Sequence, residues 1–339
     1  MRKSVLLVSQ ILLLFLFGST TENMVIEKNQ TQIKNTQENN LNIIDNTYKY
    51  PEFYRGIYLN VYSSRNFQKL SQFVENGKKS SVNSIVMDIQ RYGKDECLIP
   101  AENVQYCLNN GVHPIARIVV FQDGLTYYPV SESLIDLKIR LAETACKAGF
   151  KEIQFDYIRF NDSSALKYLS KEKRYIFIEN FLKTARNSLK KYNVRIAADI
   201  FGRIPLNSGD MIGQRMEGLD KVVDIICPMA YPSHYTWSKK MMADPYYTVF
   251  LTSKSAKERT KEAGVVAYIQ AFKMKLSLTN LSYEKYIEEQ LKAIHDSGIR
   301  GYILWNASQK YDTPFDVMKD FYKKEAERAD AVAIKDKDS

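Results

Sequence analysis

Residues 152–160 read EIQFDYIRF, and this stretch decides the fold prediction. It is short, apolar and rich in β-branched and aromatic residues, as is typical of a buried strand. Gly149 precedes it, at the end of one helical pattern, and a second helical pattern follows at 170–191. The local unit is therefore a strand followed by a helix, with a carboxylate, Asp156, near the end of the strand.

The same unit repeats along the chain. Strand-like runs stand at 56–62, 84–90, 115–121, 152–160, 194–201, 224–231, 265–272 and 301–307. Amphipathic helical stretches lie near 66–79, 101–110, 132–148, 170–191, 214–222, 253–263, 283–297 and 314–326. Eight such units predict an α/β protein with a single (β/α)₈ TIM barrel. An open doubly wound sheet is the alternative, but it rarely needs eight regular repeats, and no glycine-rich phosphate loop follows the first strand.

Residues at the element boundaries agree with this prediction. A glycine after a helix supplies the left-handed residue that ends it, and a threonine before a proline is typical of a helix start. The glycines in this position are Gly111, Gly149, Gly264 and Gly298, and Thr313-Pro314 has the pattern of a helix start.

The two ends of the chain differ in composition from the middle. Arg2 and Lys3 precede an apolar run at 5–17, and small or hydroxylated residues follow. This order predicts a secretory signal peptide over 1–20 and an exported protein, either periplasmic, cell-envelope associated or secreted. An uncleaved anchor is the alternative, because no clear Ala-x-Ala cleavage site is present.

The domain prediction follows from the same contrast. Residues 21–49 are polar and lack apolar periodicity, which predicts a flexible spacer. The barrel is expected over 50–325. The tail at 326–339 either extends the last helix or frays.

Composition narrows the function classes. The chain has 339 residues, 45% of them hydrophobic and 26% charged, and a formal net charge of +9. The basic residues are dispersed, so no nucleic-acid-binding stripe is predicted. After signal cleavage no membrane span is expected, because no other apolar segment is long enough.

Neither the four cysteines nor the three histidines have metal-site spacing, and no cofactor is predicted. Cys146 and Cys227 are expected to be buried and free, whereas a Cys97–Cys107 bond stays open.

Polar residues near the strand ends are the candidate site. Barrels of this type place their sites at the C-terminal ends of the strands, and their cores are mainly aliphatic. Asp88, Asp156 and Asp199 each follow apolar residues, and Arg117 is the natural counter-charge. Further candidates for binding substrate are Asn60, Tyr231, His234, Gln270, Trp305 and Asn306. The alternative is a buried ion-pair cluster that only fixes the barrel geometry.

Asp156 and Asp199 are the predicted catalytic pair. Neighbouring parallel strands lie about 4.8 Å apart, which is compatible with the roughly 5–5.5 Å separation of carboxyl groups in retaining glycosidases. Asp156 shares the field of Arg117 and is expected to act as nucleophile or charge-stabilising carboxylate. Asp199 is followed by apolar residues, which are expected to raise its pKa as a general acid requires. The roles could be exchanged, or Asp88 could replace one of the two.

The chain resembles a bacterial family of uncharacterised glycosyl hydrolases related to alpha-amylase-like barrels. The matching segments are Gly56-Ile57-Tyr58-Leu59, Val86-Met87-Asp88-Ile89, residues 116–121, residues 154–160, residues 198–202, residues 228–235 and Leu304-Trp305-Asn306-Ala307. The resemblance implies a (β/α)₈ fold, a polysaccharide substrate and a site around Asp156 and Asp199. The sequence departs from the family pattern at Gln90-Arg91, at Asn161 and in a short segment after Phe121, which lacks a tryptophan-containing stretch.

Two functional hypotheses follow. The first is a glycoside hydrolase that cleaves O-glycosidic bonds in an extracellular or cell-envelope polysaccharide, with carbohydrate as its partner. The second is a catalytically inactive barrel that binds glycan or a partner protein. An esterase or deacetylase would need a nucleophile or metal motif that the sequence does not contain.

Overall fold

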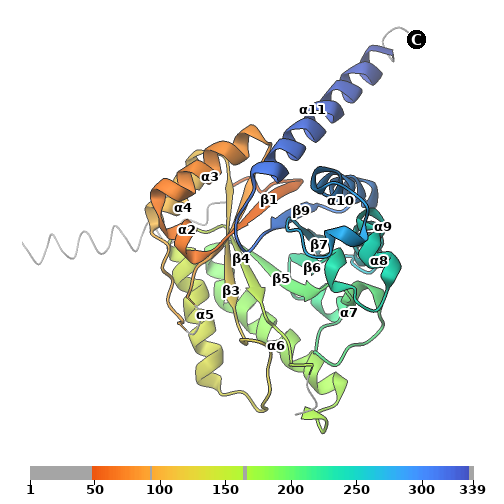
Figure 1. The fold of residues 1–339 in the computed structure, drawn as a ribbon. Helices are drawn as coiled ribbons and strands as arrows, with labels where there is room; N and C mark the ends of the chain where they lie inside the picture. The colour runs from red at the N-terminus through yellow and green to blue at the C-terminus, as the bar shows by residue number, and fades with distance from the viewer. Residues whose placement is uncertain (1–47, 92–93, 163–165, 336–339) are drawn as a thin grey trace, which may run out of the picture. The chain divides into compact units, whose positions relative to one another are not determined.

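Strands form where the apolar runs predict them (Figure 1). The computed structural model describes residues 48–91, 94–162 and 166–335. The predicted signal peptide and nearly all of the predicted spacer lie outside these residues. The strands are β1 Tyr54–Leu59, β2 Ser84–Asp88, β3 His113–Val119, β4 Glu152–Asp156, β5 Arg195–Phe201, β6 Ile225–Met229, β7 Gly264–Val265, β8 Ala267–Gln270 and β9 Gly301–Trp305.

The strands close into a parallel barrel. Each strand from β1 to β5 pairs in parallel with the next, β5 pairs with β6, and β9 pairs with both β8 and β1. β7 and β8 both pair with β6 and are separated by Val266 alone, so together they form one barrel position. The prediction of a (β/α)₈ TIM barrel is confirmed.

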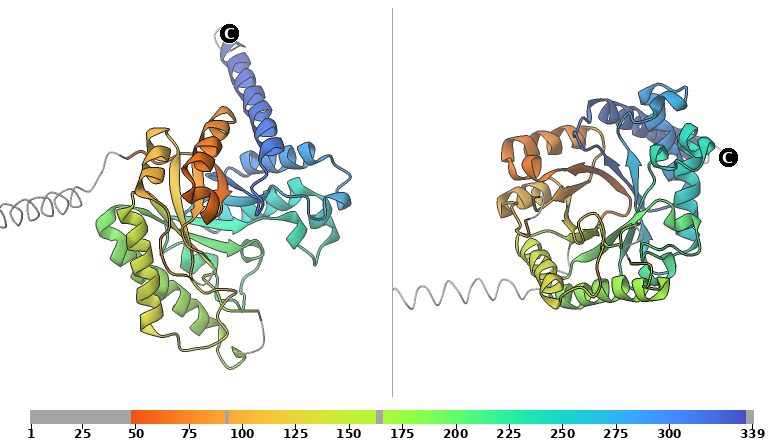
Figure 2. Two further views of the ribbon diagram at one scale, coloured as in Figure 1. Left: turned by 60° about the vertical axis from the view of Figure 1, so that its left-hand side comes forward. Right: turned by 60° about the horizontal axis from the view of Figure 1, so that its bottom comes forward.

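Helices surround the strands, as the right-hand view of Figure 2 shows. The α-helices are α2 Val61–Arg65, α3 Phe67–Lys79, α4 Ala101–Asn109, α5 Glu132–Lys147, α6 Lys171–Leu189, α7 Met216–Leu219, α8 Lys239–Ala243, α9 Pro245–Glu258, α10 Tyr283–Ser297 and α11 Asp312–Lys335. The helix expected at 253–263 begins earlier, because Asp244 caps the Tyr247 N–H at 2.9 Å and Pro245 takes the first helical position. The helix expected at 214–222 is only one turn long.

Other boundary predictions had mixed outcomes. Gly111, Gly149 and Gly298 adopt the left-handed backbone expected of them, with φ of 69°, 104° and 66°. Gly264 does not, because it already belongs to strand β7. The last helix begins at Asp312, ahead of Thr313-Pro314, and continues into the tail as far as Lys335.

The cysteines and the helix lengths settle two further points. All four cysteines are free, so no Cys97–Cys107 bond is present. Cys146 and Cys227 are buried and free, as predicted. Within the described residues, no helix is both long and apolar enough to cross a membrane.

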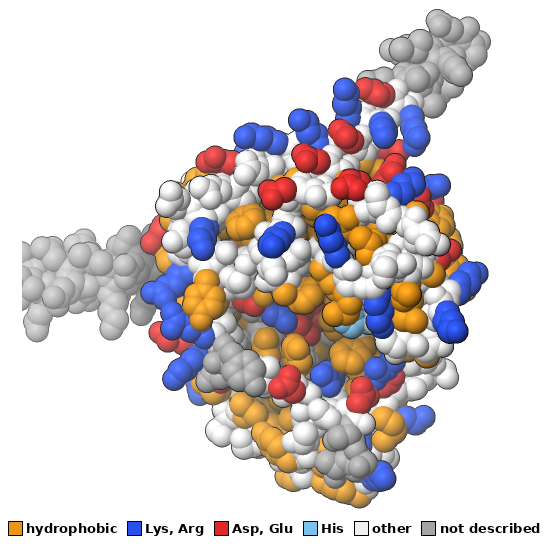
Figure 3. All heavy atoms as spheres, viewed as in Figure 1, with side chains coloured by type: hydrophobic (Ala, Val, Ile, Leu, Met, Phe, Trp, Pro, Cys, Tyr) orange, Lys and Arg blue, Asp and Glu red, His pale blue; other side chains and the backbone are white. Residues whose placement is uncertain are grey.

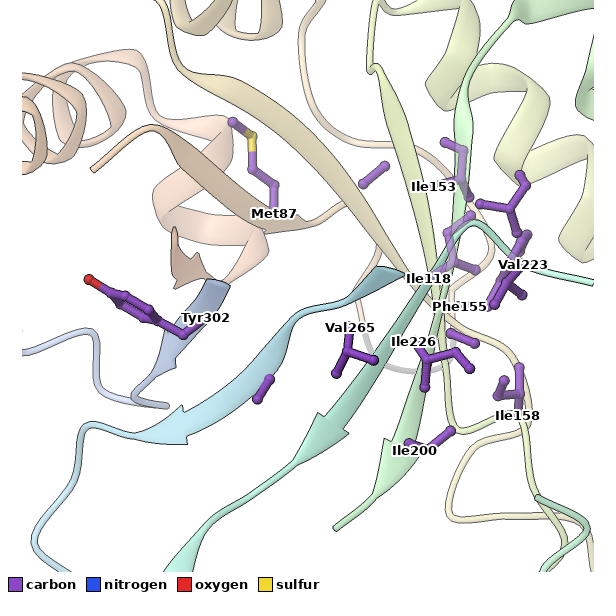
Figure 4. Close-up of a cluster of buried hydrophobic side chains, with 14 of the residues drawn as sticks. Met87, Ile118, Ile153, Phe155, Ile158, Ile200, Val223, Ile226, Val265 and Tyr302 are labelled. Carbon is purple, nitrogen blue, oxygen red and sulfur yellow. The ribbon is translucent and has the colours of Figure 1, made fainter. Parts of the chain in front are cut away.

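The core has two layers because strand residues alternate in direction. Residues such as Ile118, Ile153 and Phe155 face the helices and belong to the larger hydrophobic cluster (Figure 4). Their neighbours along the strands point into the barrel, where Tyr58, Ile115 and Tyr268 belong to a second cluster. The inward set on β4 is Glu152, Gln154 and Asp156, and all three side chains are buried.

Polar contacts close the N-terminal end of the barrel. Glu152 Oε2 accepts a hydrogen bond from Tyr54 Oη at 2.7 Å and lies 3.2 Å from His113 Nε2. Arg195 Nη1 donates to the same tyrosine oxygen at 2.8 Å. Glu152 and Asp156 are four residues apart on one strand, so this cluster and the candidate site lie at opposite ends of the barrel interior.

Candidate active site

A cavity of about 340 Å³ opens over the C-terminal ends of β3 to β6, β8 and β9. The face drawn in Figure 3 is hollowed near its centre, where acidic and basic side chains lie among hydrophobic ones. Six sequence-predicted site residues line the cavity: Arg117, Asp156, Asp199, Tyr231, His234 and Trp305. The remaining lining residues are Tyr157, Arg159, Phe201, Gly202, Arg203, Met229, Tyr235, Trp237 and Tyr268.

Asp156 is held by three hydrogen-bond donors. Arg117 donates from Nε at 3.0 Å and from Nη2 at 2.5 Å to Oδ2. The backbone N–H of Tyr157 donates to Oδ1 at 2.5 Å. Tyr157 has a φ of 54°, in the left-handed region that residues with large side chains rarely adopt. Charge-assisted donors of this kind orient a carboxylate and stabilise its negative charge.

Asp88 acts on the site through Arg117. Its Oδ1 forms an ion pair with Arg117 Nη1, and its Oδ2 accepts a hydrogen bond from Tyr58 Oη at 2.5 Å. The register places Asp88 directly beside Arg117 on the neighbouring strand. Both oxygens of Asp88 are therefore engaged within the protein, where the carboxylate helps to orient Arg117.

Asp199 has a different environment from Asp156. It is 1% exposed, its Oδ2 lies 3.8 Å from Arg117 Nε, and its buried Oδ1 has no hydrogen-bond partner among the described residues. Burial, followed by the negative charge of Asp156, raises the pKa of Asp199 well above its usual range. The two carboxyl groups are thus electrostatically distinct, as an acid and a charged carboxylate must be.

The contacts that both carboxyl groups make with Arg117 set an upper limit on the distance between them. Phe155 pairs with Ala198 in the parallel register, so Asp156 and Asp199 occupy the next position on adjacent strands. Because their Oδ2 atoms lie 3.0 Å and 3.8 Å from the same Arg117 Nε, these oxygens are at most about 7 Å apart. Glycosidase carboxyl pairs are separated by roughly 5–5.5 Å or 6.5–9.5 Å, so the arrangement is short enough for such a pair.

Aromatic side chains form part of the cavity wall. The rings of Tyr231 and Trp305 lie 5.6 Å apart, and Phe272 packs against Trp305 at 5.4 Å. Burial and the nearby Lys275 lower the pKa of His234, which favours its neutral form. Aromatic rings that pack against one another and a neutral imidazole suit a ligand with apolar faces and hydroxyl groups.

A second aromatic pair reaches the solvent. Trp237 is 60% exposed and packs on Tyr235 at 5.1 Å. Gly202 makes room for this arrangement, since an added Cβ there would collide with Tyr235 Oη and with the Met229 carbonyl oxygen.

Asp88 and three other predicted binding residues lie outside the cavity lining, and the polar atoms of these three make hydrogen bonds within the protein. Asn60 caps α2 by accepting from the Ser63 N–H at 3.0 Å. Gln270 is fully buried and holds the following loops through Ser233, Phe272 and Met274. Asn306 donates to the Ala271 and Lys310 carbonyl oxygens and accepts from the Ser308 N–H. These hydrogen bonds hold the three side chains in place, and their roles in substrate binding stay predictions.

Two arginines of the lining were missed from the sequence. Arg159 and Arg203 each lie with the guanidinium carbon 4.8 Å from the centre of the Phe201 ring. Arg159 follows the end of β4 and Arg203 follows the end of β5, and this position was the sequence feature that could have indicated a place in the cavity. Among the described residues, no three His, Cys, Asp or Glu side chains are grouped as a metal site would need.

Comparisons with known proteins agree with the fold. The chain resembles the PgaB (BpsB) glycoside hydrolase domain from Bordetella bronchiseptica, with a TM-score of 0.59 and 12% identity over 79% of this chain and 98% of that one. It also resembles an endo-beta-1,4-mannanase from Thermotoga petrophila, with a TM-score of 0.58 and 11% identity over 81% and 77% of the two chains. A chitinase from Chromobacterium violaceum gives a TM-score of 0.54 and 13% identity over 79% and 98%. No curated protein sequence matches the chain significantly.

A family model connects the sequence to a named domain. The model is described as "Putative glycosyl hydrolase domain" and matches residues 127–311, more than half of the chain. The matched segment runs from the loop before α5 to the loop after β9 and contains both Asp156 and Asp199. The chain therefore belongs to this family of glycosyl hydrolase domains.

Proposed function

We propose that the chain hydrolyses O-glycosidic bonds in an extracellular or cell-envelope polysaccharide by a two-carboxylate mechanism. The observation that carries this proposal is the pair Asp156 and Asp199. The two side chains line one cavity, lie within reach of one sugar ring and have different electrostatic environments. Family membership supports the reaction type.

Asp199 is the general acid of the proposed mechanism. Its raised pKa keeps the carboxyl protonated at a pH where an exposed aspartate is charged. The proton passes to the glycosidic oxygen as the bond between that oxygen and the anomeric carbon breaks. The leaving sugar departs as an alcohol, and Asp199 is left as a carboxylate that can accept a proton from water.

Asp156 stabilises the positive charge that develops at the anomeric carbon. It does so either as the nucleophile that forms a glycosyl ester or as a charged neighbour. Water then adds to the anomeric carbon and gives up a proton, which restores the starting state. Arg117 fixes the orientation of Asp156 throughout, and Asp88 in turn fixes Arg117.

A reducing-end assay across purified polysaccharides tests the proposal. The wild-type protein should release reducing ends from at least one polymer, and the Asp156→Asn and Asp199→Asn variants should bind that polymer without cleaving it. Binding by all three proteins with no cleavage by any would favour the alternative, a catalytically inactive barrel that binds glycan or a partner protein. An unchanged rate in either Asn variant would exclude this catalytic pair.

We also propose that the protein is exported. The basic, apolar and small-residue order of residues 1–20 supports this location, which matches a substrate outside the cytoplasm.

A further inference from the structure

Arg159 is a cation of the cavity wall with no carboxylate partner. Among the described residues it forms no ion pair, and its one hydrogen bond runs from Nη1 to the Phe160 carbonyl oxygen at 3.2 Å. Its Nε is buried and has no hydrogen-bond partner there. Burial lowers the pKa of Arg159, and the charges of Asp162 and Asp156 do not offset this effect. Burying a charge without a partner costs free energy.

The other two arginines of the cavity are neutralised. Arg117 binds Asp88 and Asp156. Arg203 donates to Asp210 at 2.7 Å and to Asp162 at 2.9 Å. The missing partner is thus specific to Arg159 and is not a general property of the cavity.

The protein holds the Arg159 guanidinium in place without neutralising it. The group lies over the rings of Phe201 and Tyr157, at 4.8 Å and 5.4 Å. The loop before α5 covers it from another side, since a Cβ on Gly124 would lie 2.6 Å from Arg159 Nη1. Backbone hydrogen bonds tie this loop to the strand end, from the Leu125 N–H to the Arg159 carbonyl oxygen at 3.0 Å and from the Asn161 N–H to the Leu125 carbonyl oxygen at 2.9 Å.

Arg159 also stands beside a second cavity. Gly124 lines a hollow of about 290 Å³, together with Phe121, Gln122, Leu125 and Tyr127. Since Gly124 abuts the guanidinium, Arg159 lies where the catalytic cavity approaches this second one. A sugar chain that runs from the carboxylate pair toward the second hollow would pass this cation.

We propose that Arg159 binds an anionic substituent of the sugar chain, so that the substrate is an acidic glycan that carries carboxylate or phosphate groups. This inference rests on the proposed function, whose substrate class it names. A guanidinium that is already oriented binds such a group strongly, through a charge-assisted hydrogen bond. A neutral sugar would leave the cation desolvated and unpaired.

The test measures binding rather than turnover, with the Asp199→Asn protein so that no polymer is consumed. Uronic-acid polymers (polygalacturonate, alginate and glucuronan) are each compared with the carboxyl-reduced form of the same polymer. A phosphomannan and its dephosphorylated form distinguish phosphate from carboxylate. The same measurements are made on three double variants, in which Asp199→Asn is combined with Arg159→Gln, Arg159→Lys or Arg140→Gln. Arg140 is an exposed arginine of α5 outside the cavity lining, so its replacement is a matched control for net charge.

At least one acidic polymer should bind about tenfold more tightly than its neutral form. Arg159→Gln should bring that ratio close to one, Arg159→Lys should keep much of it, and Arg140→Gln should leave it unchanged. Equal binding of every acidic and neutral pair, no binding of any acidic polymer, or a preference that persists in Arg159→Gln would overturn the inference. Cleavage of neutral polymers without an acidic preference would overturn it while the proposed function stands. Acidic preference without cleavage of any polymer would overturn the proposed function, while the inference about Arg159 stands.

Discussion

Asp199→Asn should change the stability of the protein in a way that depends on pH. The pKa of Asp199 is raised in the folded state, mainly by burial. Between the ordinary aspartate pKa of about 3.9 and the folded value, the folded protein keeps a proton that the unfolded chain has released. Wild-type stability therefore falls as pH rises through this window, by about 1.4 kcal/mol per pH unit. An asparagine holds no such proton and removes this dependence.

The magnitude follows from the width of the window. At pH 4 the free energies of unfolding of the two proteins should differ only by a constant offset, which arises from the amide itself. Above about pH 5 the variant should gain about 1.4 kcal/mol relative to that offset for each further pH unit, about 3–6 °C in Tm, until the pH reaches the folded pKa. Urea unfolding at half-unit steps from pH 4 to pH 7 measures the slope independently of the offset. Asp156→Asn is the matched control, and at neutral pH it should destabilise the protein, because it removes the negative charge that accepts two hydrogen bonds from the Arg117 guanidinium.

A stability difference between wild type and Asp199→Asn that stays constant from pH 4 to pH 7 would refute this reasoning. It would mean that Asp199 is charged in the folded protein, so that it has no proton to give to a leaving group at neutral pH.

Three further predictions concern the cavity rim, the closed end of the barrel and the N-terminus. Trp237→Ala should raise KM by about 2–10-fold with little change in kcat, because it removes an exposed ring that packs on Tyr235 away from the carboxylates. A fall in kcat at unchanged KM would show that this ring does not act in substrate binding. Glu152→Ala should destabilise the protein by about 3–5 kcal/mol, since it leaves the buried Tyr54 and His113 side chains without their shared carboxylate partner. KM and kcat below the unfolding transition should stay close to wild type, and thermal unfolding and steady-state kinetics check both. Intact-mass analysis of protein from the native host should show a chain processed near residue 20, whereas an intact Met1 on cytoplasmic protein would argue against export.

The barrel was predictable because each strand carries its own signal. A short run such as 152–160 alternates apolar side chains, which face the helices, with Glu152, Gln154 and Asp156, which face the barrel interior. Asp156 and Asp199 stood out for the same reason, since a carboxylate in such a run needs a partner or a function. Their approach to a common Arg117 depends on the register of β3, β4 and β5, which the sequence does not state.

Three further candidates show what the sequence does not determine. Asn60, Gln270 and Asn306 follow or end strands just as the cavity residues do, but their polar atoms cap a helix or tie loops together. Whether a polar side chain at a strand end faces the cavity depends on loop conformation, which is set by tertiary contacts. Arg159 illustrates the converse, because its place in the cavity depends on a loop more than thirty residues earlier in the chain, at Gly124.

The most direct test of the catalytic pair is the dependence of the rate on the leaving group. Aryl glycosides of a sugar from the cleaved polymer, with leaving groups of different acidity, are hydrolysed by wild type, Asp199→Asn and Asp156→Asn. Loss of the general acid should slow poor leaving groups by about 10²–10⁴-fold and affect the best ones little, because a good leaving group needs no proton. Asp156→Asn should slow the whole series to a similar extent, since charge at the anomeric carbon develops in every case. If Asp199→Asn slowed all members of the series equally, Asp199 would not be the general acid and the proposed roles of the pair would be wrong.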